Sequence, residues 1–148
     1  MTPFSILAER LLGYELSELG TGATEEAIAD AERDLGVPIK GGYREFLRRF
    51  GWGRVSHYEL FGLGGPRHTE LVRVTSSERT ETEIPPPPFL LPVMNNGAGD
   101  LICIDTRVAK EPPIVCWWHE DGPEQELTVE AGSFSSWLWG KLDILEAE

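Results

Sequence analysis

Few side chains in this sequence have the types and spacing that a chemical step would need. Residues 132–135 (GSFS) do not match the G-x-S-x-G turn that presents a nucleophilic serine, and they are typical of a helix start instead. The glycine-rich residues 62–65 (GLGG) lack the lysine of a phosphate-binding loop, and only a weak helical pattern follows them. We therefore expect neither a serine nucleophile nor a phosphate site in these segments.

The side chains that could bind a metal are scattered along the chain. His57, His68 and His119 lie far apart, and together with Cys103 and Cys116 they do not give the ligand spacing of a zinc site. Both cysteines fall in predicted strands. We expect them to be reduced core residues, since the sequence shows no signal for secretion.

Residues 95–100 (NNGAGD) look superficially like a calcium loop. They hold a single carboxylate, and no later glutamate stands at EF-hand spacing. Because Asn, Gly and Asp favour tight turns, we expect a structural turn here. The sequence therefore predicts no catalytic residue, no metal and no cofactor, and it favours a protein that is not an enzyme.

The tryptophans are more informative. Trp117 and Trp118 lie in a predicted strand, where neighbouring side chains point to opposite faces. Trp137 and Trp139 lie in a predicted helix and diverge by about 200°. One member of each pair should reach the surface, where tryptophan is a common interface anchor. Coverage of these side chains by loops is the alternative.

Charge is unevenly distributed. The chain has 25 acidic and 13 basic residues, for a net charge of −12, so phosphate backbones and anionic lipids should repel it. We expect neither direct nucleic-acid binding nor membrane binding. Residues 119–140 contain five acids and no Lys or Arg. Such a segment suits a basic protein partner, although acidic residues can also serve solubility alone.

Length and hydropathy bound the organisation of the chain. With 148 residues we expect one domain spanning 1–148. The first residues lack the positive region of a signal peptide, and no apolar run approaches the roughly 20 residues of a membrane span. We therefore expect a cytoplasmic location.

The centre of the predicted fold is residues 89–105 (FLLPVMNNGAGDLICID). Two apolar runs flank the turn at 95–100, which predicts a β-hairpin. Because nearly every residue of both runs is apolar, both faces of the hairpin should be covered. Pro92 cannot donate to a strand ladder, so it should lie at a strand end or a bulge.

Helical patterns surround this hairpin. Helices are predicted near 4–12, from an N-cap at Thr24 to a stop at Gly36, over 43–50, weakly over 67–79, and from an N-cap at Ser133. We expect a loop or tether at 15–20, a chain break at 41–42 and a tight turn at 51–53. Short strands are predicted at 58–61, 114–118 and 125–129. This order predicts a single α+β domain with a largely antiparallel central sheet and helices packed on it.

The order of these elements resembles the SUKH superfamily. The matching segments are LGVPIKGGYREFLRRFGWG, YELFGLG, FLLPVMNNGAGDLICID, IVCWWHEDG and SFSSWLWGKL, within residues 24–145. Residues 1–23 add an N-terminal helix and tether. Two positions depart from the family pattern, namely the glycines at 41–42 and the turn at 51–53, and neither should change the fold.

The resemblance implies a SUKH-like fold and a non-enzymatic immunity protein. Its bacterial members are mostly immunity proteins of polymorphic toxin systems, and its fungal relatives regulate cell-wall synthesis. This chain would bind a cognate toxin domain with a basic surface, a nuclease being one such class, and occlude its active site. A cytosolic scaffold or regulator without a toxin is the alternative. The hypothesis places the partner surface on Glu59, Trp118, Glu120, Asp121, Glu124 and Glu126.

Overall fold

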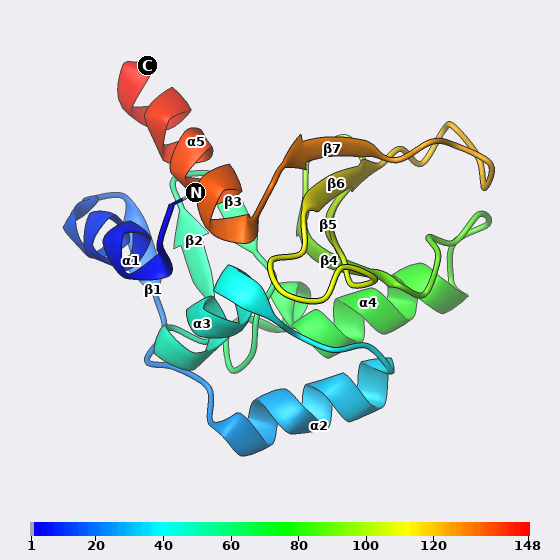
Figure 1. Cartoon of the computed structure of the whole chain (residues 1–148), viewed down its shortest axis with the longest axis horizontal. Helices are drawn as coiled ribbons and strands as arrows, with labels where there is room; N and C mark the ends of the chain where they lie inside the picture. The colour runs from blue at the N-terminus through cyan, green and yellow to red at the C-terminus, as the bar shows by residue number, and fades with distance from the viewer. Residues whose placement is uncertain (1) are drawn as a thin grey trace.

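The computed structural model describes residues 2–148, which form a single α+β domain (Figure 1). Seven strands make one antiparallel sheet in which spatial order follows sequence order. The strands are β1 (Ser17–Leu19), β2 (Gly53–Val55), β3 (Tyr58–Leu60), β4 (Leu90–Asn95), β5 (Leu101–Asp105), β6 (Ile114–Trp117) and β7 (Thr128–Ala131). The predicted α+β class with an antiparallel sheet is confirmed.

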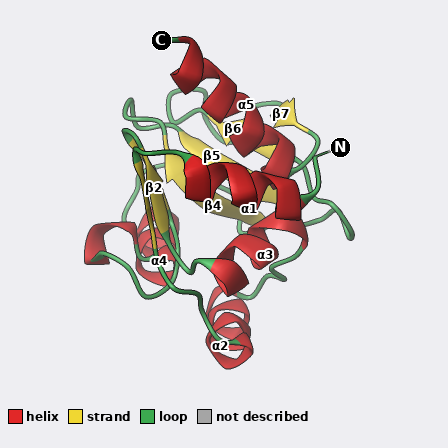
Figure 2. Cartoon of the chain, turned by 90° about the vertical axis from the view of Figure 1, so that its left-hand side faces the viewer, coloured by secondary structure: helices red, strands yellow, loops and turns green. Residues whose placement is uncertain are grey.

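The helices alternate with groups of strands. They are α1 (Phe4–Gly13), α2 (Glu25–Leu35), α3 (Gly41–Arg49), the short 3-10 helix η1 (Arg67–Thr69), α4 (Leu71–Thr80) and α5 (Phe134–Ala147). Helices α1, α3 and α5 contact one another, and Figure 2 shows them side by side in front of the strands. Helix α2 packs against α3 and α4, and α4 also contacts β4.

The predicted central hairpin is confirmed as β4 and β5. Residues 90–94 and all of β5 are buried. Alternate side chains enter two cores. The larger core includes Leu91 and Ile104, while the smaller one on the opposite face includes Leu90 and Cys103. The register shifts between Pro92 and Met94, so the proline stands at a bulge as expected.

The helix boundaries depend on the capping residues that the sequence indicated. The Thr24 hydroxyl accepts a hydrogen bond from the Ala27 amide at 3.0 Å, and the Ser133 hydroxyl accepts one from the Ser136 amide at 3.1 Å. Gly36 ends α2 in the left-handed conformation, with φ of 72°.

The expected chain break at 41–42 is wrong, because both glycines belong to α3. A Cβ built at Gly42 would lie only 2.3 Å from the hydroxyl oxygen of Ser135. The glycine therefore allows α3 to approach the start of α5 closely. Glycine at this position indicates close packing rather than the end of a segment.

The expected loop at 15–20 contains the edge strand β1, and the expected turn at 51–53 runs into β2. These two strands pair over three residues, from Ser17 opposite Val55 to Leu19 opposite Gly53. Three residues are too few for an alternating pattern to stand out. The strand expected at 125–129 is displaced, because β7 begins at Thr128 and Gln125 lies in the preceding loop.

An aromatic cluster joins α3 to α5. The rings of Tyr43 and Phe46 lie 5.2 and 5.6 Å from that of Phe134, and all three are buried. The Tyr43 hydroxyl donates a hydrogen bond of 2.6 Å to the backbone carbonyl of Phe61. The Phe61 amide in turn donates a hydrogen bond to the carbonyl of Val93 at 2.8 Å. Tyr43 thus ties the helical layer to the point where β3 meets β4.

We predict that Tyr43→Phe lowers the free energy of unfolding by about 1–2 kcal/mol. The substitution keeps the ring but leaves a buried carbonyl without its donor. Urea unfolding followed by circular dichroism measures the change. Tyr14→Phe is the matched control, because Tyr14 is only partly buried. Equal stability of the two variants would contradict this role for the hydroxyl.

Candidate protein-binding surface

The sheet opens between β3 and β4. One residue pair, Leu60 with Met94, joins the two strands. If the antiparallel register continued, Glu59 would lie opposite Asn95 and Tyr58 opposite Asn96. Instead the pairing stops, and these four residues line a cleft of about 740 Å³.

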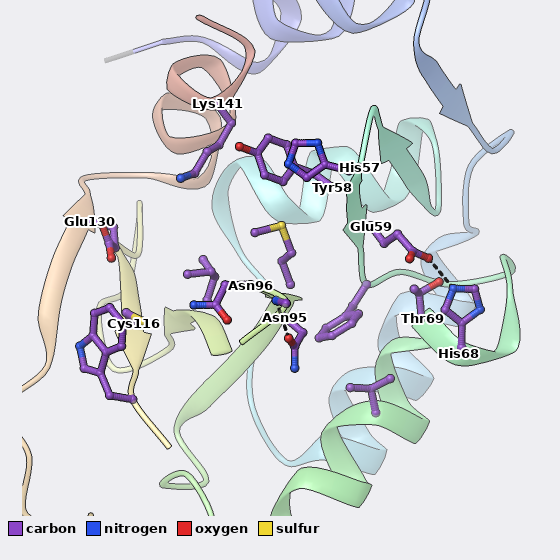
Figure 3. A pocket seen from close by; sticks show the side chains of 16 residues that line it. His57, Tyr58, Glu59, His68, Thr69, Asn95, Asn96, Cys116, Glu130 and Lys141 are labelled. Carbon is purple, nitrogen blue, oxygen red and sulfur yellow. Dashed lines mark hydrogen bonds and ion pairs between the residues drawn. The ribbon is translucent and has the colours of Figure 1, made fainter. Parts of the chain in front are cut away.

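The cleft has an apolar floor and polar walls. Its floor consists of the side chains of Phe61, Val74, Met94, Ile102 and Cys116. In Figure 3, Glu130 and Cys116 lie on one side, Glu59 and His68 on the other, and Lys141 above. The imidazole Nε2 of His68 pairs with Oε2 of Glu59, which fixes that carboxylate at the rim. A concave apolar surface with few charged groups is typical of binding sites.

Trp117, the last residue of β6, and Trp118, directly after it, point to opposite faces of the sheet, as the sequence predicted. Trp117 is buried in the smaller core, whereas Trp118 is 36% exposed and lines the cleft. The second pair also divides. Trp137 is buried, and Trp139 is half-buried with the Arg10 guanidinium 4.3 Å from its ring centroid. Trp118 is therefore the most exposed of these four tryptophans.

An acidic loop follows Trp118. The term covers residues 119–126, whose four carboxylates are all exposed: Glu120, Asp121, Glu124 and Glu126. Across residues 2–148, none of the four forms an ion pair with Lys or Arg. By contrast, Arg44 and Arg48 both pair with Glu25. The negative charge of the acidic loop thus remains open to a partner.

The acidic loop is closed by one amide side chain. Gln125 accepts a hydrogen bond from the Trp118 amide at 2.9 Å and donates to the Trp118 carbonyl at 2.8 Å. It also donates to the Gly122 carbonyl at 2.9 Å. These bonds hold the loop against the residue that lines the cleft, so loop and cleft form one surface.

A buried carboxylate anchors the start of the acidic loop. Asp100 accepts hydrogen bonds from the His119 amide at 3.0 Å and pairs with the His119 ring Nδ1 at 2.7 Å. Its other oxygen accepts from Asn96 Nδ2 at 3.2 Å. Burial by itself would raise the pKa of Asp100, but these bonds outweigh it and hold that pKa below its ordinary value.

The structure brings the sequence-predicted residues together in part. Glu59 and Trp118 line the cleft, and the acidic loop begins directly after Trp118. Sequence reasoning missed Glu130, Lys141 and the two asparagines at 95–96 as cleft residues. The asparagines and Glu130 reach the cleft through strand pairing and Lys141 through the packing of α5, and a single sequence displays neither.

The cysteine of the cleft is not activated as a nucleophile. Burial, with further contributions from Glu130 and Asp100, raises the pKa of Cys116 to about 11, so its thiol is protonated at neutral pH. Burial also raises the pKa of Cys103. Among residues 2–148, no group of three His, Cys, Asp or Glu side chains could hold a metal ion. The arrangement is suited to binding.

Comparison with known proteins assigns this chain to a family. The SMI1 / KNR4 family (SUKH-1) model matches residues 22–139, and the chain belongs to that family. Members of the family are generally immunity or regulatory proteins rather than enzymes. The resemblance inferred from the sequence is therefore confirmed.

A solved structure shares the fold. The crystal structure of a protein from Pseudomonas syringae pv. tomato is 20% identical, with a TM-score of 0.67 over 93% of this chain and 95% of that one. A search of curated proteins gives no match. In the part of the chain that the structure describes, no helix is long and apolar enough to cross a membrane.

The Asp100–His119 pair predicts a pH-dependent stability difference between the wild type and Asp100→Asn. A depressed pKa in the folded state contributes stability above the ordinary Asp pKa of 3.8. At pH 7 the variant should be less stable by about 1 kcal/mol. That difference should shrink as the pH falls below 3.8 and through the lower folded pKa.

Urea unfolding at pH 7, 5, 4 and 3 measures this difference. Dilute protein is needed, because an acidic protein loses its net charge and self-associates as it is acidified. Asp121→Asn is the control, since that carboxylate is exposed and its variant should track the wild type. A difference that stays constant down to pH 3 would refute the stabilising role of the Asp100 carboxylate.

Proposed function

We propose that this chain is an immunity protein that neutralises a cognate toxin domain. The observation that carries the proposal is the acidic loop, held beside Trp118 with four carboxylates that no Lys or Arg of residues 2–148 pairs with. Membership of the SUKH-1 family is consistent with this role.

Two physical features of the surface suit the binding of a basic protein. Unpaired exposed carboxylates accelerate the association of an oppositely charged protein and favour it over acidic competitors. A partly exposed tryptophan supplies apolar area at the centre of such a contact. Binding of this kind would cover the toxin's active site without any reaction by the inhibitor.

A nuclease is the toxin class that this charge favours. A nuclease cleft must attract phosphate, so it often carries Lys and Arg. An acidic protein with a net charge of −12 can occupy that cleft in place of the nucleic acid.

The function is tested with the C-terminal domain of the protein encoded beside this chain. That domain is expressed with and without this chain, growth is scored, and the complex is purified at low and high salt. We expect the domain to stop growth alone and to form a harmless complex with this chain. A domain that kills in the presence of this chain would contradict the proposal. A regulator would instead alter growth when its gene is deleted without any toxin present.

The partner surface is tested by replacing Glu120, Asp121, Glu124 and Glu126 with Lys. This variant should bind the toxin domain at least about tenfold more weakly, because attraction becomes repulsion. Isothermal titration calorimetry measures the affinity, and thermal unfolding checks the fold.

The matched control replaces Glu9, Glu15, Glu26 and Glu148 with Lys. These acids are exposed and lie outside the cleft and the acidic loop. The two variants have the same net charge, so the comparison separates the acidic loop from overall charge. If both variants bind the toxin domain with equal affinity, the acidic loop is not part of the interface.

A further inference from the structure

The cleft combines features that suit a long side chain with a positive end. Its apolar floor can cover an aliphatic stem, and the exposed ring of Trp118 can lie against a cation. Two carboxylates, Glu59 and Glu130, line it from different elements. They outnumber the one ammonium, that of Lys141.

The two carboxylates differ in their present partners. Glu59 Oε2 pairs with His68, so the carboxylate is oriented while its second oxygen can still accept a hydrogen bond. Glu130 forms no ion pair with any residue from 2 to 148. The Lys141 ammonium lies 5.9 Å from the ring centroid of Tyr58 and is not within ion-pair distance of Glu130. One carboxylate of the cleft is therefore open to a cation from outside.

We propose that the cleft receives an arginine side chain of the protein partner. The guanidinium would lie beside Trp118 and donate hydrogen bonds to Glu130 and to the side-chain carbonyl of Asn95, which accepts one bond, from the Gly97 amide, and can accept a second. Arginine fits better than lysine, because its planar group stacks on an aromatic ring and donates several hydrogen bonds in fixed directions. This inference deepens the proposed function and rests on it for the partner's identity.

The acidic loop and the cleft would act one after the other in recognising the partner. The acidic loop beside the cleft would attract a basic surface from a distance. The cleft would then select one side chain by shape and by hydrogen bonding. A surface whose basic residues are all too short or too recessed to enter the cleft would be attracted but held weakly.

The test uses this chain alone with N-acetyl-arginine-N-methylamide as the probe. Titration is followed by NMR at the Trp118 indole N–H, assigned with Trp118→Phe. We expect saturable shifts with a dissociation constant on the order of 10 mM, which suits a ligand of this size. The citrulline analogue has nearly the same shape without the charge, and it should bind at least about fivefold more weakly.

Two further variants should change the affinity for arginine in opposite directions. Glu59→Gln with Glu130→Gln should weaken arginine binding about fivefold or more, since the cleft loses both of its carboxylate charges. Lys141→Gln should strengthen it, because a like charge is removed. Glu9→Gln with Glu15→Gln is the matched control, with the same change in net charge outside the cleft and the wild-type affinity.

Three results would overturn the proposal: equal binding of arginine and citrulline, unchanged affinity in the cleft variant, or no saturable shift up to about 100 mM. Because no toxin is present, this outcome is independent of the coexpression experiment. If the chain neutralises its toxin but does not bind arginine, the proposed function stands and the inference about the cleft is wrong. If the chain binds arginine but forms no complex with a toxin, the cleft binds arginine as inferred and the proposed toxin partner is wrong.

Discussion

The single pairing between Leu60 and Met94 is the constraint on which the binding surface depends. It joins two parts of the sheet, and beyond it the strands separate into the cleft (Figure 3). The residue after Leu60 is fixed twice, because the Phe61 amide bonds to Val93 and its carbonyl accepts from the buried hydroxyl of Tyr43. Helix α3 is therefore tied, through the buried Tyr43, to Phe61, a residue that lines the cleft.

The helical side of the molecule and the binding surface differ in how their charged side chains are paired. On the helical side, several arginines pair with carboxylates within the molecule, as Arg44 and Arg48 do with Glu25. In the cleft and the acidic loop together, six carboxylates stand against one lysine and no arginine, and none of the six forms an ion pair with a Lys or Arg of residues 2–148. An exposed ion pair contributes little to stability, so unpaired acids cost the fold little. Their grouping on one face instead creates a field that acts on other molecules.

Much of the fold could be predicted because its central elements carry strong local signals. The hairpin of β4 and β5 has continuous apolar runs around an Asn- and Gly-rich turn, and α2 has both caps in place. The strands β1 and β2 were missed because three residues show no period, and Gly42 was misjudged because its role lies in contact with Ser135. For the site, exposure of one of two adjacent tryptophans follows from strand geometry. The presence of Glu59 and Glu130 in one cleft depends on strand pairing across the sheet, which no local pattern encodes.

The closure of the acidic loop by Gln125 has an evolutionary consequence. All its hydrogen bonds go to backbone groups of residues 118 and 122, and none goes to the side chains of the acidic loop. The four carboxylates can therefore be exchanged while the loop keeps its shape, and the two buried cores contain none of them. In the role proposed above, such a protein could follow a changing toxin through surface substitutions alone. Diversification of partner specificity is thus uncoupled from folding, which would let many lineages reuse the same scaffold against unrelated targets.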